Sequence, residues 1–357
     1  MLTPSAADAK RVFARLDELY GIGGGGGANR PGFSPEEQQA HELCSAWMRD
    51  AGLEVEIDAI GNLVGRVRGS RRDLPEVWTG SHLDSVPRGG RFDGALGVVA
   101  GLEAVEQAAR EGPLQRTLAV VAFRAEETGC HGSRARCVGA GLPGTFVEVH
   151  VEQGPRLADA GAPLGLVTSI AGIARAELEF AGRAGHAGTT PMSGREDALT
   201  AAAAYVLRVR EVAKQIEGAV ATVGRLEIEP GAENVIPTLV RLTVDARASD
   251  AERFEALITA LELEPRYRVE PVALAQAPRN ALRVEVEALG LPVVELASGA
   301  GHDAGILAAA GVESAMLFVR SLAGGVSHSP EEASSEEDVV LAVEVLTGAL
   351  RRLAAVS

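Results

Sequence analysis

The chain has 357 residues, of which 46% are hydrophobic and 23% are charged, so it can bury a large core and is long enough for two domains. This composition excludes a disordered or fibrous protein. The 49 acidic residues outnumber the 34 lysines and arginines and give a formal charge of −15. Because binding to phosphate groups draws on Lys and Arg, we expect no nucleic acid or membrane partner but a small molecule.

Cysteine usage and the opening segment predict the cellular compartment. Cys44, Cys130 and Cys137 are an odd number without metal-finger spacing, which argues against a disulfide framework and fits a reducing environment. The first residues lack a continuous apolar stretch, and no later stretch is apolar over about 18 residues, so neither a signal peptide nor a membrane span is predicted. We therefore expect a cytoplasmic protein.

Apolar runs that alternate with helical patterns predict a parallel sheet. Residues 78–81 end one expected strand, residues 96–109 fit a helix, and residues 117–123 (TLAVVAF) fit a strand that is buried on both faces. Strand, helix and strand in this order imply parallel pairing. Residues 146–151 and 315–319 are expected to add strands to the same sheet.

The segment between these last two strands has a different pattern. Strands are expected at 174–180, 222–229, 237–247 and 267–274, and helices at 195–216 and 252–261. The order β-α-β-β-α-β is that of a split βαβ sandwich, whose edge strand can pair with another chain. We therefore predict an α/β catalytic domain with a mixed, mostly parallel sheet (1–172 and 279–357), interrupted by a ferredoxin-like α+β domain (173–278).

Residues suited to metal binding follow the expected strands. In Gly80-Ser81-His82-Leu83-Asp84, His82 can bind a metal while Asp84 orients its imidazole. A His-x-Asp pair alone is weak evidence, because such pairs are common on surfaces. Asp93 lies eleven residues after His82, in a glycine-flanked loop before the expected helix, where a carboxylate could bridge two cations.

Two adjacent acids, Glu126 and Glu127, follow the buried strand at 117–123. Alone, they fit a solvated helix start equally well. At the carboxyl end of a parallel strand, however, they fall where open α/β sheets bind ligands, and one acid could bind metal while the other accepts a proton from water. His150 and His328 complete the set. Mixed imidazole and carboxylate ligation suits zinc, manganese, cobalt or nickel, and the sequence does not choose among these metals.

These motifs resemble those of the metal-dependent peptidase and amidohydrolase superfamily (peptidase family M20) and, within it, of the hydantoinase/carbamoylase branch. From about Ser34 to Glu332, the segments GSHLDSVPRGGRFDGALGV, HVEQGP, GRAGHAGTTPM, ENVIP, DAR, SGAGHDAG and HSPEE occur in the family's order. The resemblance implies a general base at Glu126 and two divalent ions per subunit. The first ion would be held by His82, Asp93 and His150, and the second by Asp93, Glu127 and His328.

The same resemblance implies that the inserted domain is a lid through which two subunits form a homodimer. His186 resembles the histidine that polarises the scissile carbonyl, often in the partner subunit's site. Asn234 and Arg247 resemble the pair that holds the amide and the α-carboxylate of the substrate, the latter through a planar guanidinium fork. Gln153 would contact the ureido group, and His302 would be structural or line the site.

The sequence departs from the family's pattern in two places. The segment between Arg134 and His150 is shorter than usual, which puts part of the pocket wall in doubt, and Thr238 stands where a glycine turn is more common. The three cysteines have no assigned role, and Cys130 is interpreted as small core filler.

The resemblance implies hydrolysis of an N-carbamoyl-L-amino acid, a ureido substrate with a carboxylate, to the amino acid, ammonia and carbon dioxide. Allantoate or ureidoglycolate amidohydrolases share almost every residue named, and only the loops HLDS and GGRFDG favour a carbamoylase. An aminoacylase or dipeptidase fits less well, because peptidase-type relatives carry an acid where this chain has His150. A non-catalytic binding protein would not need Glu126 beside the ligands.

Overall fold

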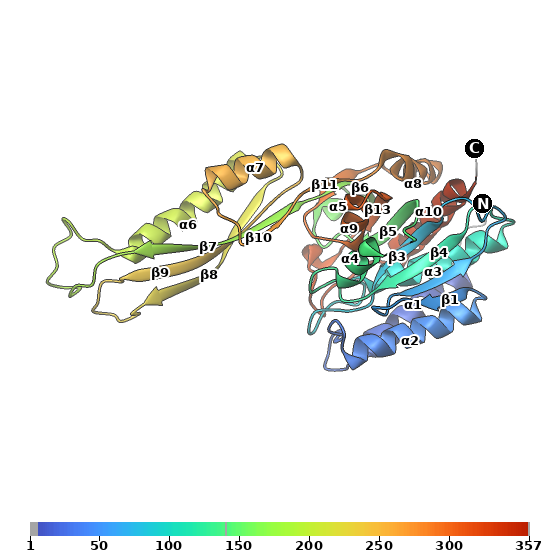
Figure 1. Ribbon diagram of the computed structural model, residues 1–357, viewed down its shortest axis with the longest axis horizontal. Helices are drawn as coiled ribbons and strands as arrows, with labels where there is room; N and C mark the ends of the chain where they lie inside the picture. Colours follow the sequence, from blue (N-terminus) through green and yellow to red (C-terminus); the bar gives the residue numbers. More distant parts are fainter. Residues whose placement is uncertain (1–5, 140, 356–357) are drawn as a thin grey trace. The chain divides into compact units, whose positions relative to one another are not determined.

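The computed structural model describes residues 6–139 and 141–355, and the chain divides into two compact units (Figure 1). The larger unit extends to Thr168 and also contains Leu274–Leu296 and the chain from Gly301 on. The smaller unit consists of Ser169–Ala273 and Ala297–Ala300. No helix among the described residues is long and apolar enough to cross a membrane.

Four parallel strands form the centre of the large sheet, most of which lies in the larger unit. They are β4 (Leu118–Phe123), β3 (Val77–His82), β5 (Thr145–Val151) and β13 (Glu313–Val319), in this spatial order. Antiparallel strands extend both sides: β2 (Leu63–Val67) and β1 (Glu54–Ile57) beside β4, and β6 (Leu164–Ile170) beside β13, with β11 (Val272–Ala273) and β12 (Glu295–Ser298) pairing with β6. The predicted α/β class with a mixed sheet is confirmed.

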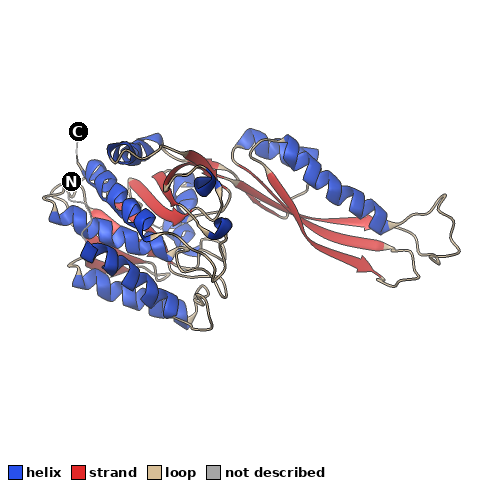
Figure 2. Cartoon of the chain, turned by 180° about the vertical axis from the view of Figure 1, so that it is seen from behind, coloured by secondary structure: helices blue, strands red, loops and turns tan. Residues whose placement is uncertain are grey.

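Helices cover the central strands (Figure 2). Every residue of β3, β4 and β5 is buried. This burial on both faces explains why these strands are uninterrupted apolar runs in the sequence. The helices of the larger unit are α1 (Ala6–Gly21), α2 (Pro35–Asp50), α3 (Ala95–Arg110), α4 (His131–Val138), α5 (Arg156–Asp159), α8 (Gln276–Ala288), α9 (Asp303–Ala309) and α10 (Glu336–Ala354), with a short 3-10 turn, η1 (Ala323–Gly325). Of these, α3 packs on β3, β4 and β5, whereas α9 packs on β5 and β13.

The smaller unit is an antiparallel sheet with two helices. Its elements are β7 (Gly172–Ala181), α6 (Ala198–Gln215), β8 (Val220–Glu229), β9 (Leu239–Ala248), α7 (Ala251–Ala260) and β10 (Tyr267–Val269), and the strand order is β10-β7-β9-β8. This is the arrangement expected for a split βαβ sandwich. Alternate residues of β9, from Val240 to Ala248, are buried in a core with Phe254 of α7, and the residues between them form the other face of the sheet.

One predicted strand was wrong. The expected strand at 267–274 is two strands, of which β10 pairs with β7 in the small sheet and β11 pairs with β6 in the large sheet. Glu270 and Pro271 separate them, and proline cannot donate a backbone hydrogen bond to a neighbouring strand. The chain therefore passes from one sheet to the other at Pro271.

Candidate metal centre

The predicted metal ligands of the larger unit lie at the carboxyl ends of its parallel strands. His82 is the last residue of β3, His150 lies near the end of β5, and Glu126 and Glu127 follow β4. Asp93 lies just before α3, and His328 lies between β13 and α10. This edge is where open α/β sheets bind ligands, as the sequence predicted.

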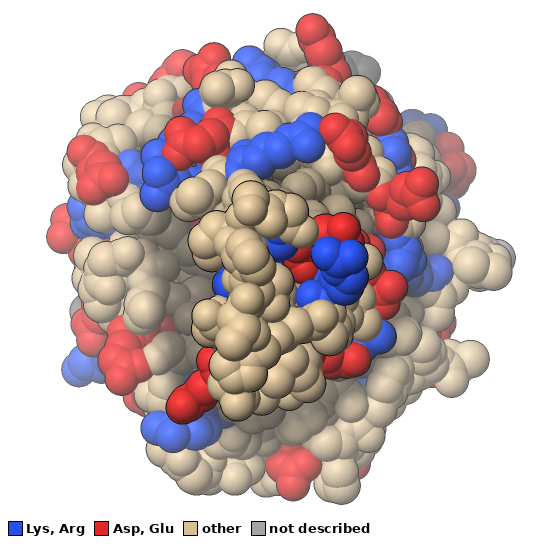
Figure 3. All heavy atoms as spheres, turned by 90° about the vertical axis from the view of Figure 1, so that its left-hand side faces the viewer, with Lys and Arg blue, Asp and Glu red and all other residues tan. Residues whose placement is uncertain are grey.

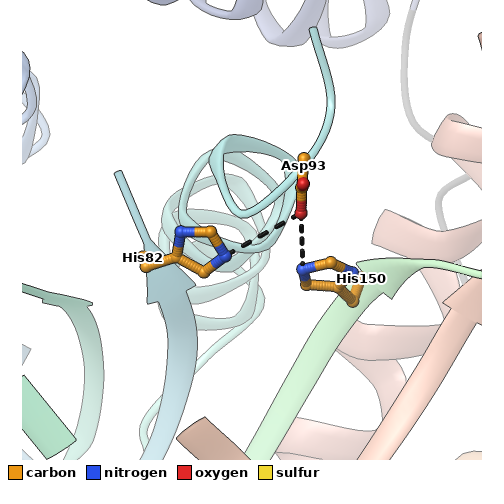
Figure 4. A group of neighbouring side chains, drawn as sticks. All are labelled: His82, Asp93 and His150. Carbon is orange, nitrogen blue, oxygen red and sulfur yellow. Dashed lines mark ion pairs between the residues drawn. The ribbon is translucent and has the colours of Figure 1, made fainter. Parts of the chain in front are cut away.

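Among the described residues, three groups of potential ligand atoms form there: two share Asp93, and the third consists of Glu148, His150 and His302. His82, Asp93 and His150 form the first group, and Asp93, Glu127 and His328 form the second; in each, one ligand atom per residue lies within 4.8 Å of the others. Figure 4 shows the Asp93 carboxylate facing both imidazoles of the first group.

The two oxygens of the Asp93 carboxylate face different groups. Oδ1 lies 3.2 Å from His150 Nε2 and 3.9 Å from His82 Nε2. Oδ2 lies 3.3 Å from His328 Nε2, which is also 3.5 Å from Glu127 Oε2. A carboxylate placed in this way can bridge two cations.

Hydrogen bonds to the other ring nitrogens orient His82 and His150. Nδ1 of His150 donates to the Val151 carbonyl at 2.9 Å, and Nδ1 of His82 lies 3.1 Å from the Asp84 carbonyl. Because a carbonyl only accepts, Nδ1 carries the proton in each ring, and in the neutral imidazole the lone pair is on Nε2, which faces Asp93. A lone pair that faces a carboxylate needs positive charge between them.

The pKa values of these residues reflect the same demand for positive charge. Burial lowers the pKa of His82, but the carboxylates of Glu126, Asp84 and Asp93 outweigh burial and hold it well above its usual value. Burial alone would raise the pKa of Asp93, yet the neighbouring imidazoles of His150, His328 and His82 hold it well below its usual value. A bound cation would meet the same demand.

The spacing of the ligand atoms fits a metal ion better than direct hydrogen bonds. Two ligands of a tetrahedral ion at about 2.1 Å lie about 3.4 Å from each other. The nitrogen and oxygen atoms of the two groups are separated by 3.2 to 3.9 Å. In addition, Glu127 Oε1 is buried without a hydrogen-bond partner among the described residues. The donor set and its spacing therefore fit divalent metal ions.

Backbone geometry that most side chains avoid brings these groups together. Gly94 has φ +64°, and a Cβ there would lie 2.3 Å from Cε1 of His82, so only glycine lets this ring lie against the start of α3. Ala125, Gln153 and His328 have φ values of 50°, 58° and 55°. Left-handed non-glycine residues concentrate at functional sites, where surrounding contacts hold the strain.

Glu126 is buried beside the first group, with Oε2 3.8 Å from Nε2 of His82. Burial raises its pKa well above the usual value; His82 opposes this shift, and Asp303 and Glu127 add to it. Asp84 accepts hydrogen bonds from the backbone N–H of Glu126 at 2.9 Å and of Glu127 at 3.1 Å. Asp84 thus contacts both His82 and the turn that carries the two acids.

Three other residues with sequence-based expectations lie in the larger unit. Nε2 of Gln153 donates to Asp93 Oδ2 at 3.3 Å, so Gln153 lies beside the candidate centre. His302 is buried with its ring centroid 4.6 Å from that of His150. Cys130 is buried and unpaired, as expected for core filler, and its Sγ donates to Glu126 Oε1 at 3.6 Å.

The smaller unit brings His186 and Asn234 together. His186 pairs with Val235 in an isolated antiparallel bridge, and the N–H of Ala187 donates to the Asn234 carbonyl at 2.9 Å. These segments follow β7 and precede β9, at one end of the sheet.

Arg247 lies at the other end of the same ladder. The β7 and β9 strands pair from Ile173 with Arg247 to Ala181 with Leu239, which spans roughly 25 Å at the usual rise per residue. Asn234 lies beyond Leu239. One chain therefore does not bring Asn234 and Arg247 together.

Sequence reasoning assigned no role to several buried acids around the candidate centre. Glu332 and Glu37 each accept backbone hydrogen bonds from loops that carry proposed ligands. Glu37 follows Ser34 with the spacing of a capping box, which marks it as a helix-capping residue but not as a partner of the Glu126 turn. Glu332 lies within the HSPEE motif, four residues after His328.

Comparison with known proteins identifies the family of this chain. The profile of peptidase family M20/M25/M40 matches residues 78–352. The chain is 38% identical to an N-carbamoyl-L-amino acid amidohydrolase of Geobacillus stearothermophilus over 97% of this chain and 98% of that one. It is 33% identical to allantoate deiminase 1 of Glycine max over 91% of this chain and 86% of that one.

The fold is also known from solved structures. A hydantoinase/carbamoylase family amidase from Burkholderia multivorans superimposes with a TM-score of 0.91 at 31% identity, covering 97% of this chain and 98% of the other. The chain therefore belongs to the metal-dependent peptidase family M20/M25/M40 and, within it, to the hydantoinase/carbamoylase branch.

Proposed function

We propose that this protein is a binuclear-metal amidohydrolase that hydrolyses the ureido C–N bond of an N-carbamoyl-L-amino acid to the amino acid, ammonia and carbon dioxide. The observation that carries the proposal is the Asp93 carboxylate, whose two oxygens face two separate groups of ligand atoms beside the buried Glu126. The likeness to a named N-carbamoyl-L-amino acid amidohydrolase supports the substrate class. The likeness to an allantoate deiminase keeps allantoate as the second candidate.

In this proposal, His82, Asp93 and His150 would hold one divalent ion, and Asp93, Glu127 and His328 would hold a second. The ligand types suit zinc, manganese, cobalt or nickel. When bound, such a pair supplies Lewis acidity toward the ureido carbonyl and lowers the pKa of water.

Glu126 is the proposed proton carrier. Its Oε1 already accepts from the Cys130 thiol, so Oε2, which faces the first group, is the oxygen that takes a proton from the attacking water. The raised pKa of Glu126 suits a group that must hold this proton and then return it to the leaving nitrogen. Asp84 keeps Glu126 in place through the backbone N–H.

Arg247 is the proposed partner of the substrate carboxylate, and its contacts among the described residues do not use all of its N–H donors. Nε and Nη2 donate to the two oxygens of Asp245 at 2.7 and 3.2 Å, and Nη1 donates to the Gly299 carbonyl at 2.9 Å. Of the five N–H donors of an arginine, these contacts use three. One donor on each Nη atom remains for a contact with a substrate carboxylate.

We further propose that the enzyme is a homodimer in which a second chain supplies His186 and Asn234. If Arg247 and Asn234 act on one substrate, they must come from different chains, because one ladder holds them at opposite ends. The edge strand β8 offers a pairing surface, with exposed Val220, Leu226 and Ile228 and an unpaired backbone edge among the described residues.

The surface charge agrees with a small-molecule substrate. Acidic and basic side chains are interspersed over the face in Figure 3. The chain as a whole carries an excess of acidic side chains, with a formal charge of −15.

A substrate panel tests the proposed activity. Metal-loaded protein should release ammonia from N-carbamoyl-L-amino acids faster than from allantoate, and N-acetyl amino acids and dipeptides should be poor substrates. A chelator should abolish this activity, and a divalent transition metal should restore it. Faster turnover of allantoate would replace the first candidate by the second, and full activity of verified metal-free protein would refute the metal centre.

The neighbours Glu126 and Glu127 should differ in what they lose on substitution. Glu126→Gln should keep the wild-type metal content and lose roughly 100-fold or more in kcat, as expected for removal of a general base. Glu127→Gln, its matched control, should bind one ion less, because an amide is a weaker ligand than a carboxylate. Metal analysis beside steady-state kinetics measures both. If Glu126→Gln lost metal but showed normal kinetics after metal was added back, Glu126 would be the metal ligand and Glu127 the general base.

Arg247→Ala should lower kcat/KM on an N-carbamoyl-L-amino acid by roughly 30-fold or more, since removal of one partner of a buried charge pair commonly costs about 2–5 kcal/mol. Arg247→Lys should rescue this loss only in part, because an ammonium lacks the fork. On the matching carboxamide, Arg247→Ala should change little. Arg175→Ala is the control for the loss of an ion pair with Asp245, because Arg175 pairs with the same carboxylate at 2.9 Å. Equal losses of kcat/KM on the acid and on the carboxamide would show that Arg247 supports the fold and does not bind the substrate carboxylate.

Mixing two inactive variants tests the contribution of a second chain. His186→Ala and Glu126→Gln should each be inactive alone. After subunit exchange, half of a random mixture is heterodimer with one complete site, so activity should return to about a quarter of the wild-type value. Exchange is followed by native mass spectrometry with differently tagged chains. Confirmed heterodimers without activity would place His186 in the site of its own chain or outside catalysis.

A further inference from the structure

Glu332 binds two loops that carry proposed metal ligands. Its side chain is buried, with 5% of the residue exposed. Oε1 accepts hydrogen bonds from the backbone N–H of Phe92 at 2.8 Å and of Asp93 at 3.0 Å. Oε2 accepts a hydrogen bond from the Ser327 hydroxyl at 2.6 Å. One carboxylate thus contacts the backbone of Asp93 and the residue next to His328.

These contacts belong to a closed network. The Ser327 hydroxyl also accepts from Nε2 of Gln153 at 3.2 Å, and the same nitrogen donates to Asp93 Oδ2 at 3.3 Å. The path therefore runs from Glu332 through Ser327 and Gln153 to the Asp93 carboxylate, and returns through the Asp93 N–H. Both the backbone and the side chain of Asp93 are held by it.

The glycine-rich loop before Asp93 closes tightly around Glu332. A Cβ at Gly90 would lie 2.1 Å from Glu332 Oε1, so the loop can reach the carboxylate only with glycine at this position. Charge-assisted hydrogen bonds such as these three are about twice as strong as bonds between neutral groups. Glu332 therefore has the contacts of a residue that fixes the loop and not of a surface acid.

The two loops that Glu332 joins are distant in the sequence but share a group of ligands. Asp93 belongs to both groups, whereas His328 belongs to the second. The His328 side chain is 51% exposed, against 4% for Asp93, so packing alone does little to fix its position. A tie between its neighbour Ser327 and the Asp93 loop limits how far these two ligands can separate.

We infer that Glu332 is a positioning residue that sets the metal affinity of the centre by holding the Asp93 and His328 loops together. This inference rests on the proposed metal pair. Groups that orient the ligands of a metal commonly contribute 10- to 100-fold to affinity, roughly, without touching the ion. A purely structural role would instead affect the stability of the fold and leave metal affinity unchanged.

The test compares the metal affinity of apoprotein variants, measured by competition with a chromophoric chelator, with their thermal stability. Glu332→Ala should bind zinc or manganese roughly 10- to 100-fold more weakly than the wild type. Glu332→Gln should lie between them, because its amide oxygen can still accept from Phe92 and Asp93. Ser327→Ala, which removes only the tie to the His328 loop, should weaken binding less than Glu332→Ala.

Glu285→Ala is the matched control. Glu285 is another buried glutamate, 4% exposed, and it pairs with Arg352 between α8 and α10. Its loss should lower the melting temperature and leave metal affinity within about twofold of the wild type, since none of its contacts reaches a proposed ligand.

Three outcomes separate the inference from the proposed function. Normal metal affinity in Glu332→Ala, or in both Glu332→Gln and Ser327→Ala if the alanine variant does not fold, would overturn the positioning role alone. An equal loss of affinity in Glu285→Ala would also overturn it, because the effect would then follow general stability. Absence of metal binding by the wild type would overturn the proposed function itself.

Discussion

Several carboxylates and imidazoles lie close together around Asp93 at one edge of the large sheet, and the surrounding structure must hold this cluster in place. Each oxygen of this side chain faces a different group of ligand atoms, at distances that suit a shared cation better than a hydrogen bond. Without positive charge, the Nε2 lone pairs and the carboxylate would repel one another. The surrounding fold must therefore hold these groups close together against their own electrostatics.

Buried carboxylates that accept backbone N–H bonds provide much of this support. Glu37 of α2 accepts a hydrogen bond from the backbone N–H of Ala125 at 2.8 Å, and Asp84 accepts from the backbone N–H groups of Glu126 and Glu127. The turn that carries the two acids is therefore held from two directions. Glu332 does the same for the Asp93 loop. Such bonds satisfy the buried carboxylate, and they also fix turns whose left-handed residues would otherwise relax.

The long strands of the smaller unit separate its proposed substrate-binding residues. A ladder of paired residues between β7 and β9 places Arg247 at one end and the segments of His186 and Asn234 at the other. A rigid sheet cannot bring its two ends to one substrate. A site that uses all three residues therefore needs two chains, which gives the proposed dimer a geometric reason that is independent of buried surface.

The sequence by itself determined the central strands, the βαββαβ order of the insert and which imidazoles and carboxylates cluster around Asp93. It could do so because burial on both faces leaves uninterrupted apolar runs, and because ligands at strand ends lie in short motifs. Only the tertiary structure decided that the chain changes sheets at Pro271, that Asn234 and Arg247 lie apart, and that Glu332 binds the backbone of Asp93. Periodicity reports which face of a local element is buried. Packing between segments that are distant in sequence decides which strands pair and which backbone N–H group donates to a buried carboxylate. A single sequence carries no local signal for such packing.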